Sequence, residues 1–331
     1  MRADSPPTGG FLARPRVAAY ASTRVHFGFP NFGYRPALAL LVALSAGCSV
    51  AAEDYSLDPD SGETHAVVKV RHTLMQDGSA RGDALTGFVR VPAGTDPQTI
   101  FQLAGLVQSL PPVGECRAEL PSSEALDFSE ISRAELLEAR SVDLQTAAGR
   151  HELAPFAFPT VADLLRGVVY TSRDRDASHL PAGANYTLDA RGIGDSPEGE
   201  GLDLSSDHFS PDLPGQVTVG AVALSELSSL PSTGVLDLSW SASSASEDLI
   251  LATLRTQSVS WNCTFSDKEG FGSLPLVMDN GLNLANEGGT VQLELHRVRS
   301  TSHAGSGGIA EVRVTFDFAV QAQIEFAQAE Q

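Results

Sequence analysis

Basic side chains are scarce in this chain. Among its 331 residues, 22 are Lys or Arg and 41 are Asp or Glu, which gives a formal net charge of −19. A nucleic-acid-binding protein needs a cationic surface that displaces counterions from phosphates, so the charge argues against that class. Apolar residues make up 42% and charged residues 19%, the composition of a globular protein, and the length suits about two domains.

A long hydrophobic run is also missing. The strongly apolar stretch that contains Pro36–Leu44 covers about 12 residues, which as a helix would span ~18 Å of a ~30 Å bilayer core. Residues 1–47 carry five Arg and one Asp, a net charge of +4, whereas residues 48–331 carry a net charge of −23. A basic start, a short apolar run and small residues predict that residues 1–47 are a secretory leader. Four Arg precede Val25, which is unusual for a leader, and we expect the start codon downstream, near Val25.

The leader ends in Leu44-Ser-Ala-Gly-Cys48, which resembles a bacterial lipobox, with Ser45 where the commonest form has Leu. The resemblance implies that Cys48 becomes the N-terminus and carries acyl chains that attach the protein to a membrane. Ser49 in the next position implies the outer membrane, with the protein facing the periplasm or the surface. Residues 48–62 are small, acidic and turn-rich, and they predict a flexible tether.

Apolar and polar residues alternate along many segments after the tether. The longest is Glu311–Phe326, where eight apolar side chains alternate with mostly polar ones. At ~3.3 Å per residue this strand would exceed ~50 Å, so we expect it to bend or to change sheets. The alternation directs inward Val314, Phe316, Phe318 and Val320, and it directs outward Thr315, Asp317 and Gln321. The other predicted strands are Thr64–Leu74, Ala84–Val91, Gly167–Ser172, Ala184–Ala190, Gln216–Gly220, Val235–Ser241, Leu249–Thr256, Ser258–Phe265 and Thr290–Val298.

Many short strands with Gly, Pro and Ser turns predict a mainly β fold, as one or two antiparallel β-sandwich (Ig-like) domains with a few short connecting helices. We place the boundary in the Ser-rich segment near residue 220, which gives domains 63–220 and 221–331; the alternative is one large sandwich. Asp96-Pro97 predicts one helix start. Ser132–Glu135 matches a capping box and predicts another.

Motifs for catalysis and cofactors are absent from the sequence. There is no G-x-S-x-G, no G-x-x-x-x-G-K-[ST] and no C-x-x-C, and His151-Glu152 lacks the second His of H-E-x-x-H. We therefore predict no catalytic, cofactor-binding or metal-ligating residue and favour a protein that is not an enzyme.

Two acidic loops and two tryptophans leave alternatives open. Carboxylates in Arg173–Asp176 and Asp195–His208 could bind Ca²⁺ or act as acid and base, but solvated loop charge is the preferred interpretation. Trp240 and Trp261 share strand faces with aliphatic residues, which favours core packing over stacking on a sugar.

Three cysteines are present, and lipidation of Cys48 would leave Cys116 and Cys263. Export to an oxidising compartment favours a disulfide between these two. Spacing alone cannot show proximity, so two separate buried thiols remain the alternative.

Several segments resemble a group of predicted surface lipoproteins of myxobacterial type. The resemblance extends over most of residues 64–327. It is carried by Ala157-Phe158-Pro159, Gly167–Ser172, Leu180-Pro181, Gly234–Trp240, Trp261–Phe265, Gly270–Pro275, Leu295–Arg299 and Val314–Phe318. Those proteins are largely uncharacterised, so the resemblance implies an address and a fold but no activity.

These observations predict a lipid-anchored cell-envelope protein with a non-enzymatic role in binding, adhesion or assembly, and a protein or glycan as partner. The alternative is a secreted-type hydrolase or carbohydrate-binding module that uses the acidic loops. Carboxylates about 5–10 Å apart across a cleft would favour the alternative.

Overall fold

The computed structural model describes residues 62–92, 96–103, 105–119, 134–157, 167–172, 175–194, 201–202, 212–230, 234–245, 247–257, 259–277, 289–306 and 308–326. The contacts divide the chain into Met1–Asp54 and Tyr55–Gln331, and every described residue belongs to the second unit. The predicted leader, Cys48 and residues 48–61 of the tether lie outside the described residues. Within the described ranges, no helix has the length and apolar character needed to cross a membrane.

The second unit is mainly β, as predicted. Its largest sheet, here sheet A, has twelve strands. In neighbour order the main path of sheet A is β3 (Cys116–Glu119), β17 (Ser260–Ser266), β16 (Leu249–Arg255), β19 (Thr290–Ala304), β20 (Ile309–Phe326), β1 (Gly62–Met75), β2 (Ala80–Pro92), β8 (Val168–Thr171) and β7 (Ala154–Ala157). Off this path, β14 (Ser229–Leu230) pairs with β20, and β4 (Glu135–Leu137) and β9 (Arg175–Asp176) pair with β2.

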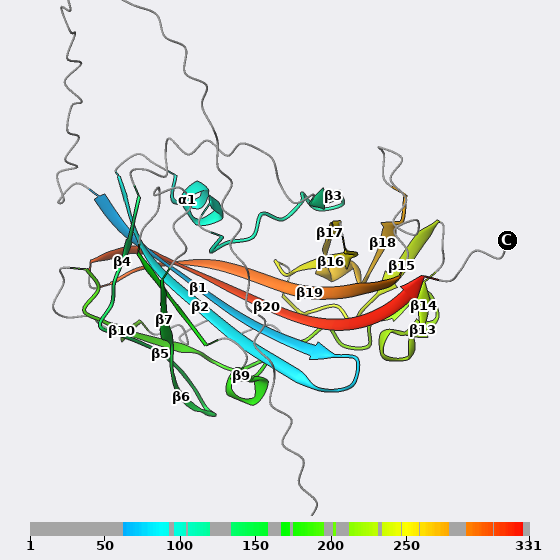
Figure 1. The fold of residues 1–331 in the computed structure, drawn as a ribbon, viewed down its shortest axis with the longest axis horizontal. Coiled ribbons are helices and arrows are strands. Elements are labelled where there is room, and N and C mark those ends of the chain that lie inside the picture. The colour runs from blue at the N-terminus through cyan, green and yellow to red at the C-terminus, as the bar shows by residue number, and fades with distance from the viewer. Residues whose placement is uncertain are drawn as a thin grey trace, which may run out of the picture. The chain divides into compact units, whose positions relative to one another are not determined.

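Two four-stranded sheets pack on the same face of sheet A, one toward each end of β20 (Figure 1). Sheet B consists of β11 (Gly201–Leu202), β10 (Thr187–Arg191), β5 (Ser141–Thr146) and β6 (Gly149–Glu152). Sheet C consists of β13 (Val222–Ala223), β12 (Thr218–Val219), β15 (Val235–Ser239) and β18 (Phe271–Pro275). The helical turns are α1 (Pro97–Leu103), η2 (Ala177–His179), η3 (Leu224–Glu226) and η4 (Asp267–Glu269). This layering makes the unit a β-sandwich.

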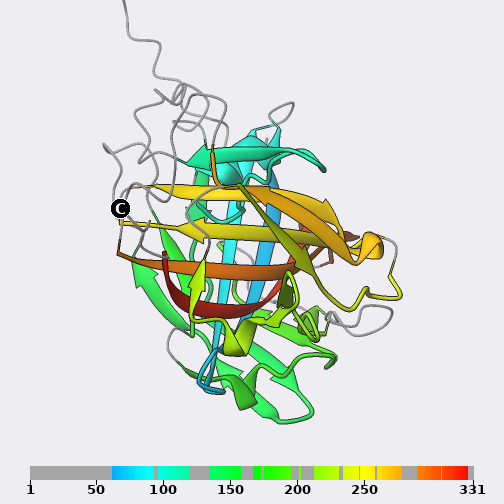
Figure 2. The same ribbon diagram turned by 90° about the vertical axis from the view of Figure 1, so that its right-hand side faces the viewer.

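Strand β20 runs through both halves of the sandwich. It pairs antiparallel with β19 along most of its length and parallel with β1 from Ile309 to Gln321. The strand curves but stays in sheet A (Figure 1). Figure 2 shows the strong twist of the sheet, in which β16 and β19 run across the view while β1 and β2 run steeply. A cut at residue 220 would therefore divide sheet A, whose strands come from both sides of that residue.

The opposite face of sheet A is covered at one end by α1. Ile100 and Phe101 pack on Val67 and Val89, which face away from sheets B and C. Asp96 Oδ1 accepts a hydrogen bond from the backbone N–H of Gln98 at 3.0 Å, so it caps the helix as predicted.

The prediction that a second helix starts at Ser132–Glu135 is wrong for the residues of this segment that the structure describes. Glu135 and Leu136 belong to strand β4, and Leu136 pairs with Val89 of β2. Residues 132–133 lie outside the described residues. Pairing with an available sheet edge has prevailed over the local capping pattern.

Candidate functional site

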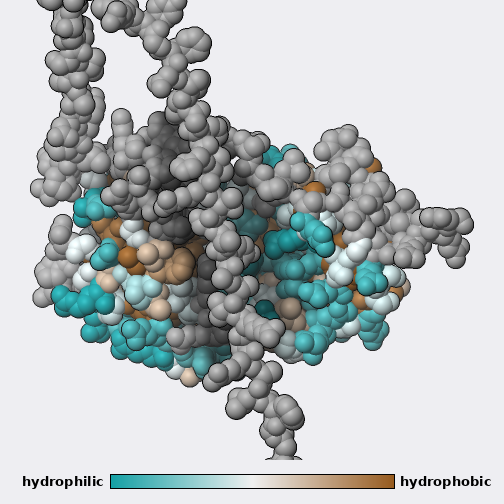
Figure 3. Space-filling view, in the orientation of Figure 1, coloured by the Kyte–Doolittle hydropathy of each residue, from teal (hydrophilic) through white to brown (hydrophobic). Residues whose placement is uncertain are grey.

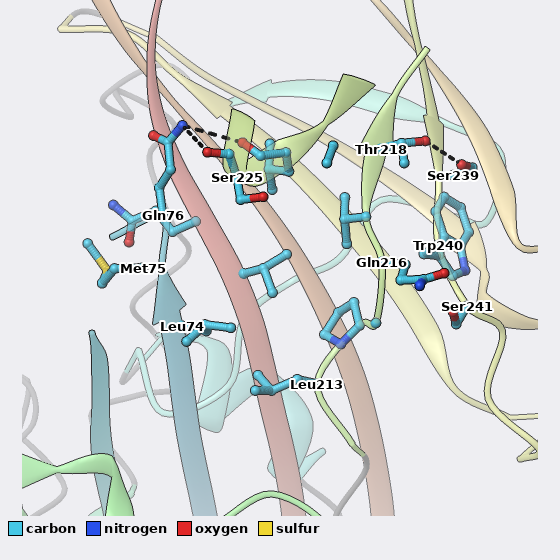
Figure 4. A pocket seen from close by; sticks show the side chains of 17 residues that line it. Leu74, Met75, Gln76, Leu213, Gln216, Thr218, Ser225, Ser239, Trp240 and Ser241 are labelled. Carbon is cyan, nitrogen blue, oxygen red and sulfur yellow. Dashed lines mark hydrogen bonds between the residues drawn. The ribbon is translucent and has the colours of Figure 1, made fainter. Parts of the chain in front are cut away.

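A cavity of about 740 Å³ lies beside the end of strand β1 (Figure 4). It is formed by the end of β1 with the turn after it, by two residues of β20, and by the segments that lead into and out of sheet C. The lining residues are Leu74, Met75, Gln76, Leu213, Pro214, Gly215, Gln216, Val217, Thr218, Ala223, Leu224, Ser225, Ser239, Trp240, Ser241, Val320 and Gln321. The volume falls within the usual range of small-molecule sites, about 300–1,000 Å³.

The alternation of apolar residues explains the two walls that sheet A provides. Leu74 of β1 and Val320 of β20 are paired neighbours in the parallel ladder, so both side chains point toward the face that carries sheets B and C. Leu213 packs against the core under sheet B, whereas Val217 and Trp240 belong to the core under sheet C. The cavity therefore lies where these two cores meet.

Local contacts hold the sheet C side of the cavity. The Trp240 indole is 5% exposed, and its N–H donates to the backbone oxygen of Asp267 at 3.0 Å. Gln216 adopts a φ of 45°, a left-handed conformation that is uncommon outside glycine. The neighbouring Gly215 oxygen accepts a hydrogen bond from Ser241 N–H at 3.0 Å, which ties this loop to the strand exit.

None of the 17 lining residues carries an ionisable side chain. The middle of the cavity is aliphatic, and uncharged polar groups lie at its two ends (Figure 4). At one end Gln76 Nε2 donates to the carbonyl oxygens of Leu224, Ser225 and Leu227 at 3.1 to 3.4 Å. At the other end the hydroxyls of Thr218 and Ser239 are 2.7 Å apart. The cavity can hold an uncharged molecule, and the 17 described residues of its lining offer no general acid, base or nucleophilic thiol.

Arg297 braces the cavity from behind. Its guanidinium is 4% exposed, pairs with Asp267 at 2.9 Å and donates to the backbone oxygens of Asp212, Leu213 and Ser241. Leu213 and Ser241 are both in the lining, so one buried side chain positions two walls. Beside it, Arg299 makes two hydrogen bonds with the carboxylate of Asp248, at 2.6 and 2.8 Å.

A second charged cluster is buried on the other face of sheet A. His296 Nδ1 lies 2.6 Å from Asp317 Oδ1, and His296 Nε2 lies 2.9 Å from Glu294 Oε2. The second oxygen of Asp317 contacts Arg71 Nε at 3.0 Å and Lys69 Nζ at 3.4 Å. Both ring nitrogens face carboxylates, so His296 donates on both sides as an imidazolium and has no nitrogen left to accept a proton.

The electrostatics of this cluster agree with its geometry. Burial lowers the pKa of His296, but the carboxylates of Asp317 and Glu294 outweigh burial and raise it above its ordinary value. Burial likewise opposes ionisation of Asp317, yet His296, Arg71 and Lys69 hold its pKa well below the usual range. The pKa of Glu294 is also lowered, because hydrogen bonding and charge from His296 outweigh its burial.

Asp317 points outward from the core under sheets B and C, as predicted, but it is not exposed to solvent. Its residue is 2% exposed, because both faces of sheet A are covered at this point. Alternation placed it opposite the apolar core, which is correct, but it could not show a second covering layer.

The other residues singled out from the sequence have definite positions. Cys116 and Cys263 are opposite each other on β3 and β17 and form a disulfide with an S–S distance of 2.02 Å. Trp240 and Trp261 are both buried in the core under sheet C. Asp176 caps η2, whereas Arg173, Asp174 and the carboxylates of Asp195–His208 lie outside the described residues.

No three His, Cys, Asp or Glu side chains of the described ranges are arranged to hold a metal ion. The candidate-site residues that sequence reasoning missed are the lining residues of the cavity other than Trp240, together with Arg297. A signal for Arg297 existed, because it continues the inward face of Val291, Leu293 and Leu295 on β19. A charge on an apolar strand face indicates a buried ion pair.

Comparisons with known proteins add little. No protein-family model matches the chain, and no curated protein matches it. Among solved structures, the Mu homology domain of Fcho1 from Danio rerio, solved with a bound Eps15 peptide, is similar at 11% sequence identity. The match covers 80% of this chain and 97% of that one, with a TM-score of 0.21, which is too low to carry an argument about fold or function.

Proposed function

We propose that this chain is a lipid-anchored cell-envelope protein that binds a small, largely apolar molecule without catalysing a reaction. The observation that carries the proposal is the cavity of about 740 Å³ whose lining is free of ionisable groups. Small-molecule sites are clefts or cavities of this size, so an open space of this volume beside two filled cores is a candidate binding site.

The buried charges support binding over catalysis. Each carboxylate of the two clusters has a cationic partner, and His296 is held by carboxylates on both sides. Charges used in this way stabilise strand contacts and are not poised for proton transfer to a ligand. Stacking of a sugar on an exposed tryptophan, one form of the carbohydrate-binding alternative, finds no support, because both indoles are buried.

A role based on a broad apolar docking face is less well supported. Hydrophilic residues make up most of the described surface visible in Figure 3, with small apolar patches between them. The most exposed large apolar side chains of sheet C are Phe271 at 64% and Val235 at 51%, and a hydrogen-bonded polar pair, Asp237 and Ser273, lies between them on the same face.

The proposed anchoring in the cell envelope is based on Leu44-Ser-Ala-Gly-Cys48 and on the acidic tether that follows it. Cells that express the full chain should incorporate an alkyne-tagged fatty acid into it, and Cys48→Ser should abolish the label and release the protein from membranes. Label that persists on the variant would contradict the anchor.

Ligand binding can be measured with N-phenyl-1-naphthylamine, an uncharged probe whose fluorescence rises in apolar surroundings. We expect saturable binding to the wild-type protein and at least a tenfold loss in Val320→Phe, because the larger ring projects into the cavity. Val235→Phe makes the same exchange at an exposed site on sheet C and should bind like the wild type. Equal binding by all three proteins would place the probe elsewhere, and absence of binding to the wild type would contradict the function.

A further inference from the structure

We infer that the ligand of this cavity carries no formal charge: an amphiphile with an aliphatic body and hydroxyl or amide polar groups, such as a long-chain alcohol or a glycerol monoester. The inference rests on the proposed function and narrows it to one chemical class. It excludes fatty-acid anions, alkyl ammonium ions and phosphate-bearing lipids.

The first argument is the cost of an unpaired charge. Moving an ionised group from water into an apolar site is unfavourable unless a partner charge and hydrogen bonds replace its hydration. The lining provides no partner of either sign. Arg297 lies directly behind the wall, but its guanidinium already contacts the Asp267 carboxylate and three backbone oxygens. A ligand carboxylate would have to compete with all of them.

The second argument is the arrangement of the uncharged polar groups. Gln76 and Ser225 lie at one end of the cavity, and Gln216, Thr218, Ser239 and Ser241 lie at the other (Figure 4). Leu74 and Leu213 lie between the two ends (Figure 4), and Val320 is paired with Leu74 in the parallel ladder. Hydroxyl and amide groups satisfy neutral donors and acceptors, whereas the aliphatic middle suits a hydrocarbon chain.

The third argument is the contrast with the rest of the molecule. The chain carries 63 charged residues, 22 basic and 41 acidic, yet none of the charged residues that the structure describes is among the 17 lining residues. The net charge of −19 attracts cations at long range. An alkyl ammonium ion is therefore the most stringent test of the inference. The negative charge of the protein attracts this ion at long range, so only the cost of placing its charge in the uncharged cavity opposes its binding.

The test is displacement of bound N-phenyl-1-naphthylamine by three ligands with the same ten-carbon chain: 1-decanol, decanoate and decylammonium, below their aggregation limits at pH 8. We expect 1-decanol to displace the probe at a concentration at least tenfold lower than either ion. Decanoate or decylammonium that matches or exceeds 1-decanol would overturn the inference and leave the proposed function standing. Absence of probe binding would instead overturn the proposed function itself.

Ions could bind weakly either because the lining offers them no partner charge or because they are less hydrophobic than an alcohol. A variant with a charged side chain in the lining distinguishes these two causes. Gln76→Lys places an ammonium group in the lining, at the polar end where Gln76 lies in Figure 4, and decanoate should then displace the probe at a concentration at least fivefold lower than in the wild type. Gln323→Lys puts the same charge on the exposed face of β20, outside the lining, and should leave the order of the ligands unchanged. An equal gain in both variants would mean that long-range charge, not the cavity, selects the ligand.

Discussion

The two halves of strand β20 face different interiors. Around Phe316 and Phe318 the space under sheet B is filled by rings: Tyr186 lies 5.4 Å from Phe316, and His72 lies 5.6 Å from Phe318, centroid to centroid. Two residues further along, Val320 borders a cavity of about 740 Å³. The strand and its alternation are the same in both places, so the covering layer makes the difference.

Sheet B brings large side chains onto β20, whereas the cavity is bordered by a loop and short elements: Leu213–Val217, β12 and η3. A filled region resists both truncation and enlargement of its side chains. Enlarging a side chain that borders a cavity has little effect on stability, but it fills the space that a ligand would occupy. Variants on the two halves of one strand can therefore show which region serves stability and which serves binding.

The largest effect is expected in the filled half. Phe318→Ala should lower the free energy of unfolding by about 3–5 kcal/mol, because it removes a fully buried ring and leaves a cavity. Thr315→Ala, on the other face of the same strand, should change it by about 0.5 kcal/mol or less. Chemical denaturation of both variants measures the difference. Equal losses would show that β20 does not have one dominant core face.

A loss of about 3 kcal/mol is expected when the buried carboxylate is removed. Asp317→Asn leaves Lys69, Arg71 and His296 without their shared partner, and an unpaired buried charge is costly. Asp237→Asn changes an exposed carboxylate of sheet C that bonds only Ser273 among the described contacts, and it serves as the control in the same denaturation series. A mild effect of Asp317→Asn would mean that the cluster is solvated and open.

The pH dependence of folding follows from the same cluster. The pKa of His296 is raised in the folded protein, so its contribution is complete below the ordinary histidine range and is lost as the pH rises through the raised value. The pKa of Asp317 is lowered, so its contribution is complete above the ordinary aspartate range and is lost as the pH falls toward the lowered value. His296→Gln should remove the alkaline loss of stability and keep the acid loss. An unchanged alkaline limb in denaturation curves recorded from pH 6 to 10 would contradict this assignment.

The smallest change in stability is expected at the cavity. Val320→Phe should alter the free energy of unfolding by about 1 kcal/mol or less, because the added ring enters empty space and avoids overpacking. The same substitution should abolish most probe binding. A loss of several kcal/mol would mean that the space around Val320 is already filled in solution.

Alternation predicted most of the framework. It placed the long strands of sheet A, but not the short strands β3, β4, β7, β9 and β14. It also placed the inward face of β20, and both tryptophans lie in the core where it put them. The capping pattern wrongly predicted a helix at Glu135 and Leu136. The pattern extends over only four residues, so it contains no information about strand β2, with which these residues pair. The cavity could not be predicted from the sequence, because its lining comes from five separate segments and none of them has an unusual composition. Arg297 was detectable as a charge on an apolar face, but its carbonyl partners belong to distant loops.

The most direct test uses the two tryptophans as reporters of position. Trp261→Phe leaves Trp240, which lines the cavity, and Trp240→Phe leaves Trp261, which does not. Titration with a brominated long-chain alcohol, an uncharged quencher, should give strong, saturable quenching in Trp261→Phe and weak quenching in Trp240→Phe. Equal quenching of the two variants, or none in either, would contradict the claim that this cavity is a binding site.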